Sequence, residues 1–396
     1  MNDSLTLSNN ILEQTRKINV FTSLIIIAFG LIGHFLTIYL FIQKKYRTNS
    51  SNVYMLCLAI FDGLFLILHL FEDIIRTYLD IYDPIRSSSS SLTTSNLIKF
   101  LRLINITDNI DLTCKIINYF RYMLRMISAY VIVAFTIQRL IIVYLPLGRK
   151  FKSTRSAWLT VCLIGIISML LNIWVFYLFE INKNETSHYC DAKRSLKSIY
   201  FGITVIYITV IMLIPCLIIF ICNCLIIRQT NRSDMARRSL QMNNNNKHNH
   251  YLVKNNKSIT NNTRLLSINN GISNSSKSIK INNNNLLKMK VYYMRKDQKN
   301  MKNNLSNSQT VLKTLLFISF TYAILNLPYF IAWSVFFYEI AYNKIKAFGK
   351  NYLFTALQIT EIFYILNYSI YFYINFILGS SFRDQFLSAS KYIIKQ

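Results

Sequence analysis

The sequence predicts an all-α membrane protein, a bundle of seven transmembrane helices. The chain of 396 residues is 53% hydrophobic, and its mean hydropathy is +0.30. Charged residues make up 15% of it, whereas a soluble domain has about 25%. Apolar stretches long enough to cross a hydrocarbon core of about 30 Å recur along the chain. We expect the spans at residues 19–42, 52–78, 112–145, 157–179, 198–227, 310–338 and 351–378.

The first three spans end where charge or proline interrupts the apolar run. Lys44 and Lys45 close the first span, and Pro146 with several basic residues closes the third. The second span carries Asp62 near its middle. Because cytoplasmic loops carry an excess of Lys and Arg, both basic groups predict an extracellular N-terminus and a cytoplasmic C-terminus.

The last four spans follow the same alternation. A polar loop over 180–197, which contains Cys190, separates the fourth span from the fifth. Pro215 and Pro328 lie inside the fifth and sixth spans, where proline is tolerated and commonly kinks a membrane helix.

Two segments lie outside the predicted membrane domain of residues 19–378, and one long loop lies within it. Residues 1–18 are expected to form an extracellular N-terminus, and 379–396 a short cytoplasmic tail with an amphipathic helix. The loop 228–309 is rich in Asn, Lys and Ser, a composition typical of disorder.

The net charge of +27 is concentrated in this loop, because 228–313 holds 17 basic and two acidic residues. Such a loop favours the anionic inner leaflet of a lipid bilayer. No nucleic-acid-binding domain accompanies the charge, so nucleic acid is not an expected partner.

The third span carries a polar stripe. Arg121, Arg125, Ser128 and Arg139 fall on one side of a helix that turns about 100° per residue. Charge inside a bilayer is costly, so this stripe should face protein or water rather than lipid.

Several short motifs, in this order and spacing, resemble a rhodopsin-like (class A) G-protein-coupled receptor. Within that family the pattern is most similar to invertebrate FMRFamide-like neuropeptide receptors. The resemblance covers all seven spans and rests on Leu58-Ala59-Ile60-Phe61-Asp62, on Cys114 placed 25 residues before Arg139, on Leu325-Asn326-Leu327-Pro328, and on Asn367 followed by Phe382-Arg383.

The resemblance implies a ligand site at the outer ends of the spans. It pairs Cys114 with Cys190 in a disulfide between the third span and the second outer loop.

Ligand contacts are expected at Arg121, Arg125, Glu361 and Asn326, with an extracellular peptide or a small molecule as ligand. An arginine at 121 argues against amines. The alternative for the arginines is an internal salt bridge to Glu361, Glu72 or Asp73, since an unpaired buried charge is costly.

Mid-membrane, the resemblance implies a possible sodium site at Asp62, Ser128 and Asn367, and no other cofactor. The alternative is a protonated Asp62 hydrogen-bonded to His34, Ser128 and Asn367, with a structural role only.

At the inner ends, the resemblance implies coupling to a heterotrimeric G protein. The family has an acidic residue where Gln138 stands, and Ser308 stands near the expected acidic partner on the sixth span. We therefore expect Arg139 to be weakly restrained and basal signalling to be raised. The alternative is an arginine that only snorkels to the interface. The residues expected to couple or switch are Gln138, Arg139, Pro146, Asn223, Pro328 and Asn375.

Two of these expectations have structural alternatives. Asn223 and Asn375 stand where the family has two tyrosines that meet through water, but polar groups that hold helices together are an equal reading. Pro328 can be a hinge or an ordinary kink.

The remaining expectations concern location and class. Asn2, Asn105 and Asn184 begin glycosylation sequons in segments expected outside a plasma membrane that the chain crosses several times. No enzyme motif is found. A chemosensory receptor for a small molecule is the nearest alternative. A transporter or channel is less favoured, because the seven spans show no internal halves.

Overall fold

The computed structural model describes residues 2–43, 49–82, 96–104, 110–144, 153–183, 188–233, 235, 239, 317–339 and 347–394. The chain divides into two compact units, Met1–Asn223 with Lys313–Gln396, and Cys224–Leu312. All the packing below belongs to the first unit. Of the second unit, the structure describes a helical segment over 224–233 and two single residues.

The described residues of the first half of the chain form helices and one β-hairpin. A π-helical turn (η1) over Leu70–Ile74 joins α2 to α3, and β1 Phe179–Lys183 pairs antiparallel with β2 His188–Ala192. The helices are α1 Asn2–Ile42, α2 Ser50–His69, α3 Ile75–Tyr82, α4 Asn96–Ile104, α5 Asp111–Tyr144, α6 Thr154–Leu171 and α7 Val175–Leu178.

The described residues of the second half are mostly helical. A 3₁₀ turn (η4) over Arg194–Leu196 leads into α8 Lys197–Ile208, then a second π-helical turn (η5) over Thr209–Leu213 and helix over 214–233. Beyond it lie a helix over Phe317–Glu339, α11 Ala347–Ser369, α12 Tyr371–Leu378 and α13 Ser380–Ile394.

In the part of the chain that the structure describes, six helices are long and apolar enough to cross a membrane. A seventh span is formed if the pair Asn351–Ser369 and Tyr371–Leu378, bent by 55°, is counted as one. The protein is therefore a seven-helix membrane bundle, as the sequence predicts.

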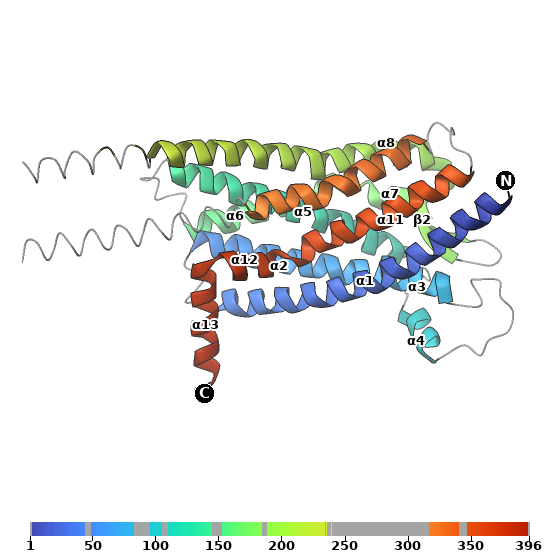
Figure 1. Ribbon diagram of the computed structural model, residues 1–396, viewed down its shortest axis with the longest axis horizontal. Helices are drawn as coiled ribbons and strands as arrows, with labels where there is room; N and C mark the ends of the chain where they lie inside the picture. The colour runs from blue at the N-terminus through green and yellow to red at the C-terminus, as the bar shows by residue number, and fades with distance from the viewer. Residues whose placement is uncertain are drawn as a thin grey trace, which may run out of the picture. The chain divides into compact units, whose positions relative to one another are not determined.

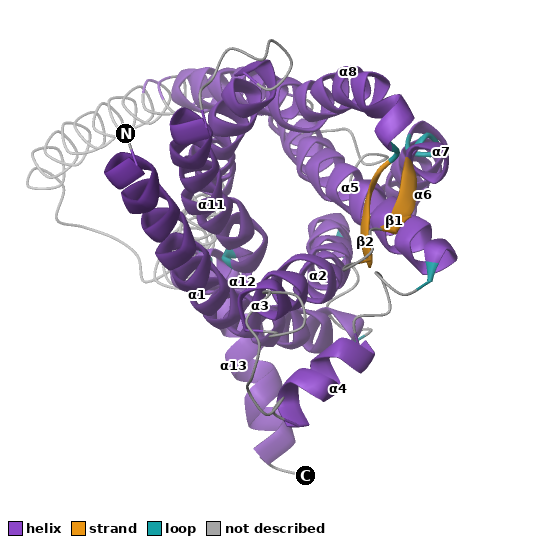
Figure 2. Cartoon of the chain, turned by 90° about the vertical axis from the view of Figure 1, so that its right-hand side faces the viewer, coloured by secondary structure: helices purple, strands orange, loops and turns teal. Residues whose placement is uncertain are grey.

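The helices pack around a core of large apolar side chains. α1 packs against α2 and α11, and α2 also packs against α5 and α6 (Figure 2). Phe65 of α2 lies at the centre of this core, with its ring 4.3 Å from that of Tyr368 and 6.1 Å from that of Tyr364. These aromatic contacts join α2 to α11 inside the bundle.

α1 begins 17 residues before the predicted start of the first span at Asn19. Polar contacts hold this extension in place. Asn351 of α11 donates to Asn9 Oδ1 at 2.6 Å and to Ser8 Oγ at 3.1 Å. Contacts between distant segments, which a hydropathy pattern does not contain, stabilise the additional turns.

Pro215 explains the second π-helical turn. Proline has no N–H, so it leaves preceding carbonyl groups without their helical partner. Ile214 N–H bonds to Thr209 O, and the freed carbonyls accept from two tyrosines. Tyr130 Oη donates to Val210 O at 3.1 Å, and Tyr322 Oη donates to Ile211 O at 2.9 Å. The proline thereby ties its own span to α5 and to the helix Phe317–Glu339.

The chain turns sharply after α12, and α13 leads away from the bundle (Figure 1). Gly379 allows this turn, because a Cβ there would lie 2.5 Å from Asn375 O. Phe382 anchors α13, with its ring 5.7 Å from Phe41 of α1 and 5.8 Å from Phe372 of α12.

Candidate functional site

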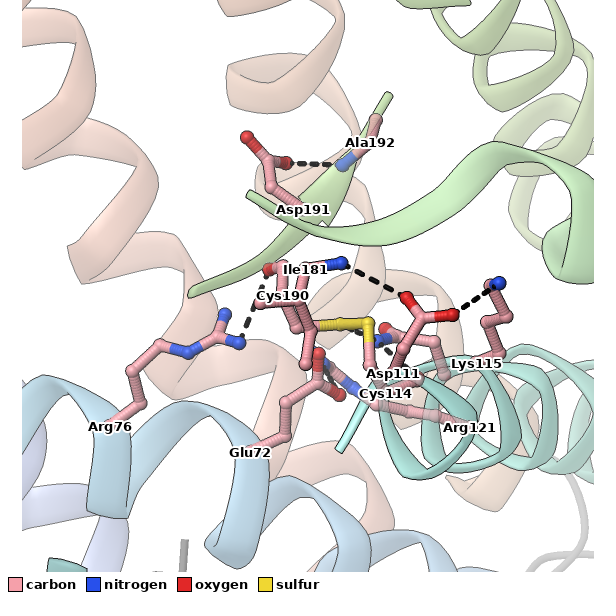
Figure 3. The surroundings of a disulfide bond; sticks show 11 residues. Glu72, Arg76, Asp111, Cys114, Lys115, Arg121, Ile181, Cys190, Asp191 and Ala192 are labelled. Carbon is pink, nitrogen blue, oxygen red and sulfur yellow. Dashed lines mark hydrogen bonds and ion pairs between the residues drawn. A yellow bond between two sulfur atoms is a disulfide. The ribbon is translucent and has the colours of Figure 1, made fainter. Parts of the chain in front are cut away.

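One end of the bundle, which we call the disulfide end, is closed by a covalent link. Cys114 at the start of α5 is bonded to Cys190 of β2, with their Cα atoms 5.7 Å apart (Figure 3). The predicted disulfide is confirmed. Asp111 adds a second link, because its Oδ1 accepts from Ile181 N on β1 at 3.2 Å. Both strands of the hairpin are thus fastened to the first turn of α5.

A polar cavity of about 210 Å³ lies beside the disulfide. Side chains from the two π-helical turns, α3, α5, the hairpin, α8 and the helix Phe317–Glu339 form its walls. Arg121 and Arg125 are among the lining residues, whereas Glu361 and Asn326 are not. Asn326 is buried and donates to Tyr322 O at 2.8 Å, one turn earlier on its own helix.

Arg121 is held by two carboxylates. It forms ion pairs with Glu72 and Asp73, consecutive residues of the π-helical turn η1. Figure 3 shows Glu72 reaching Arg121 beside the disulfide. The internal salt bridge left open by the sequence therefore exists, and it joins α5 to η1. Glu361 forms no ion pair with Arg121 among the described residues.

Glu361 belongs to a second polar group. Its Oε2 accepts from Asn19 of α1 at 3.2 Å, and its Oε1 lies 3.9 Å from Nε2 of the buried His69. His69 Nδ1 lies 2.6 Å from Asp73 Oδ2. The imidazole therefore stands between two carboxylates, and it joins α2 to α11.

His69, Asp73 and Glu361 place one ligand atom each within 4.8 Å of one another, a set that could hold a metal ion. However, Arg121 already bonds the Asp73 oxygen that faces the imidazole. This arrangement favours pairing between imidazole and carboxylate over metal binding.

Arg125 lies one turn after Arg121 and has a different environment. Its guanidinium lies 5.2 Å from the ring centroids of Phe65 and Tyr364, and 5.9 Å from that of Tyr122. Its Nε is buried without a hydrogen-bond partner. Among the residues that the structure describes, Arg125 forms no ion pair.

Asp62 lies in the middle of the bundle and is fully buried. Ser128 Oγ donates to its Oδ1 at 2.5 Å, while Oδ2 has no hydrogen-bond partner in the described part of the chain. Asn367 Oδ1 accepts from Tyr371 Oη at 2.8 Å, and His34 Nε2 contacts Tyr368 O at 2.8 Å. The structure therefore brings Ser128 to Asp62 but gives His34 and Asn367 other partners. An orphaned carboxylate oxygen beside a hydroxyl is a donor set that fits a hard cation such as sodium.

The opposite end of α5, which we call the Arg139 end, contains Arg139. Its guanidinium donates to Ser51 Oγ at the start of α2 and lies 5.3 Å from the ring centroid of Phe135. Its Nε is buried without a hydrogen-bond partner. Within the described residues, Arg139 contacts no carboxylate.

The other predicted switch residues are placed as follows. Asn375 Nδ2 donates to Tyr371 O at 2.8 Å, and Asn223 Oδ1 is buried without a partner, so the two amides do not bond to each other among the described residues. Pro328 lies inside the helix Phe317–Glu339. Pro146 and Ser308 lie outside the described residues.

Of the three sequons, Asn105 and Asn184 lie outside the described residues, and Asn2 begins α1. Sequence reasoning missed His69 and Asn19, which organise the second polar group. The only available signal was the spacing of four residues between His69 and Asp73, which places them on one helix face.

A membrane bundle with a disulfide-fastened hairpin, a polar cavity beneath it and an arginine at the far end of the same helix is the architecture of a signalling receptor. The family model of the 7 transmembrane receptor (rhodopsin family) matches residues 33–370. The chain belongs to this family of G-protein-coupled receptors, which are receptors and not enzymes. It is accordingly a multi-pass protein of the plasma membrane. The comparison with curated proteins finds no match.

Proposed function

We propose that the protein binds an extracellular ligand in the cavity at the disulfide end and activates a heterotrimeric G protein at the Arg139 end. The observation that carries this proposal is the course of α5, which contributes Arg121 and Arg125 to the cavity and Arg139 to the opposite end. Family membership supports both partners. In this proposal, binding stabilises an active conformer that already exists in the ensemble.

A neuropeptide is the ligand class that we propose, since the sequence motifs of the spans resemble those of FMRFamide-like receptors. A complete drug-sized ligand needs a pocket of about 300–1,000 Å³, and this cavity has about 210 Å³. It would therefore take one terminal group or side chain of a longer molecule. A small chemosensory ligand is the second candidate, because the cavity is small and aromatic side chains such as Tyr207 and Trp333 line part of it.

Of the predicted ligand contacts, Arg121 and Arg125 face the cavity. Glu361 and Asn326 do not line the cavity, so their proposed effect on the ligand would be indirect. Glu361 would act through its contact with His69, and Asn326 through its hydrogen bond to Tyr322 O.

The proposed orientation places the disulfide end and the N-terminus outside, and the C-terminal α13 inside. Basic residues after the first and third spans support it. In this orientation the sequons at Asn2, Asn105 and Asn184 would be accessible to glycosylation.

Between the two ends, Asp62, Ser128 and Asn367 would hold a sodium ion that stabilises one conformer. Asp62 Oδ2, which has no other partner among the described residues, supports this reading. The alternative, a protonated Asp62 bonded to Ser128, predicts that sodium has no effect on ligand affinity.

At the Arg139 end, coupling would use Gln138, Arg139 and Pro146, while Asn223, Pro328 and Asn375 would adjust as the helices move. The lack of a carboxylate partner for Arg139 among the described residues supports this reading, because no anion there competes with a G protein for the guanidinium.

The experiment is a screen of the full chain in cells, with amidated peptides beside small odorant-like molecules, read by calcium and cyclic-nucleotide responses. Arg139→Ala should abolish the response at equal surface expression. Arg155→Ala, an exposed arginine at the start of α6, is the matched control and should leave it intact. A ligand response that persists in Arg139→Ala would contradict the coupling role.

A further inference from the structure

Arg121 and Arg125 of α5 line the same cavity. Among the described residues, Arg121 forms ion pairs with carboxylates and Arg125 does not. Arg121 has two carboxylates in ion-pair contact, Glu72 and Asp73. Arg125 has aromatic rings around it, its Nε is buried without a hydrogen-bond partner, and no carboxylate among the described residues lies within ion-pair distance of it. Net charge does not explain this difference, because the cavity walls hold three acidic and three basic side chains.

Burial of an unpaired charge is unfavourable, and the aromatic rings compensate only in part. A cation over an aromatic face gains only a modest electrostatic attraction from the ring. The partly buried guanidinium of Arg125 retains N–H donors that require acceptors. The position of Arg125 at the cavity wall is therefore suited to an anionic group that arrives from outside.

From this asymmetry we infer that Arg125 is the binding site for a carboxylate group of the ligand, and that Arg121 is a positioning residue. This inference rests on the proposed ligand-binding role of the cavity and specifies the ligand chemistry. A carboxylate can accept two parallel hydrogen bonds from one guanidinium. Tyrosine hydroxyls supply further donors in the same wall. Tyr122 Oη and Tyr200 Oη lie 3.3 Å apart, and both residues line the cavity.

The volume limits what surrounds the carboxylate. About 210 Å³ holds an acidic side chain, the free carboxyl end of a peptide or a small organic acid, but not a folded peptide. The three sources share one recognising group, so the experiment must separate them.

The test measures binding without a G protein. The purified full chain in lipid nanodiscs is melted with three probes and their neutral amides: benzoate, N-acetylphenylalanine with a free carboxylate, and N-acetylglutamic acid α-amide. At least one carboxylate should raise the melting temperature more than its own amide does, and the probe that does so identifies the source.

Arg125→Gln should weaken binding of that carboxylate about 10- to 100-fold, the usual loss for a charge-assisted hydrogen bond. Arg125→Lys should retain part of the affinity, because the charge remains but the planar fork is lost. Lys115→Gln at the start of α5 removes the same charge from an exposed site and should leave affinity unchanged. Arg125→Met provides a second neutral variant if Arg125→Gln is poorly expressed.

Two results would overturn the inference: no carboxylate stabilises the wild type more than its amide, or both neutral variants bind as tightly as the wild type. The outcome is separable from that of the proposed function. Carboxylate binding without any cellular response would leave the inference standing and contradict coupling. Responses to peptides without any carboxylate, unchanged in Arg125→Gln, would leave the receptor standing and contradict the inference.

Discussion

The two arginines of α5 that line the cavity have the same side chain but different neighbours. Arg121 and Arg125 are four residues apart on one helix face, yet the first pairs with Glu72 and Asp73, whereas the second forms no ion pair among the described residues and lies against aromatic rings. The difference arises because η1 presents two consecutive carboxylates at the height of Arg121. The first arginine therefore stabilises the fold, and the second is available for a ligand.

This assignment predicts opposite effects of two similar substitutions on the unliganded protein. Arg121→Gln should destabilise it by up to about 3–5 kcal/mol, because the buried Glu72 and the partly buried Asp73 lose their counter-charge. Arg125→Gln should be neutral or stabilising, because it removes an unpaired charge. Thermal unfolding of the purified variants measures both. Lys115→Gln, which breaks an exposed pair with Asp111, should cost less than about 1 kcal/mol.

The sequence predicts the residues of this site better than it predicts their pairing. Cys114 and Cys190 could be paired because family spacing identifies both. The partner of Arg121 remained open among three acids, since the choice depends on where η1 rotates Glu72 and Asp73. A run of apolar residues around them contains no sign of a π-helical turn. His69 was missed because one histidine in an apolar helix does not reveal which carboxylates the neighbouring helices bring.

At the scale of elements, the two π-helical turns make polar contacts with neighbouring helices. Such turns are frequent at functional sites. η1 aims two carboxylates at α5, and η5 releases two carbonyls that accept from neighbouring helices. The seven spans were predictable from hydropathy, but these turns follow from tertiary contacts and from Pro215. Tertiary contacts also explain why α1 begins earlier than the hydropathy pattern predicts.

The contact at η5 predicts the effect of removing one hydroxyl. Tyr322→Phe should destabilise the protein by about 1–3 kcal/mol, because Ile211 O is then buried without a donor. The control is Tyr119→Phe, which removes a similar bond to Met169 O on the outer surface of the bundle rather than in its core. Equal melting temperatures of the two variants would contradict this account of the turn.

At the scale of the whole molecule, the disulfide between Cys114 and Cys190 holds the β-hairpin in place beside the cavity. The disulfide closes a separation of 76 residues and fastens the hairpin to α5. In the chain-entropy description, a loop of this length contributes about 4 kcal/mol.

We therefore expect Cys114→Ser to lower the melting temperature and the amount of protein at the cell surface. Cys190→Ser should have the same effect, and the double variant should add nothing further. Cys162→Ser, which removes an exposed free thiol, is the control. Additive losses in the double variant would show that the two cysteines act separately.

The Arg139 end raises the question of how strongly the inactive state is held. Family members commonly restrain this arginine with an adjacent acid, but here the neighbour is the neutral Gln138, and Arg139 bonds Ser51 instead. A hydroxyl offers a weaker partner than a carboxylate, so the active conformer should be more populated without ligand. Gln138→Glu should lower basal signalling, since a bias of about 1–2 kcal/mol changes a two-state ratio about 5- to 30-fold. Gln138→Asn keeps the residue neutral and should leave basal signalling unchanged. Wild-type basal activity equal to that of mock-transfected cells, with receptor present at the surface, would show that Ser51 restrains Arg139 sufficiently.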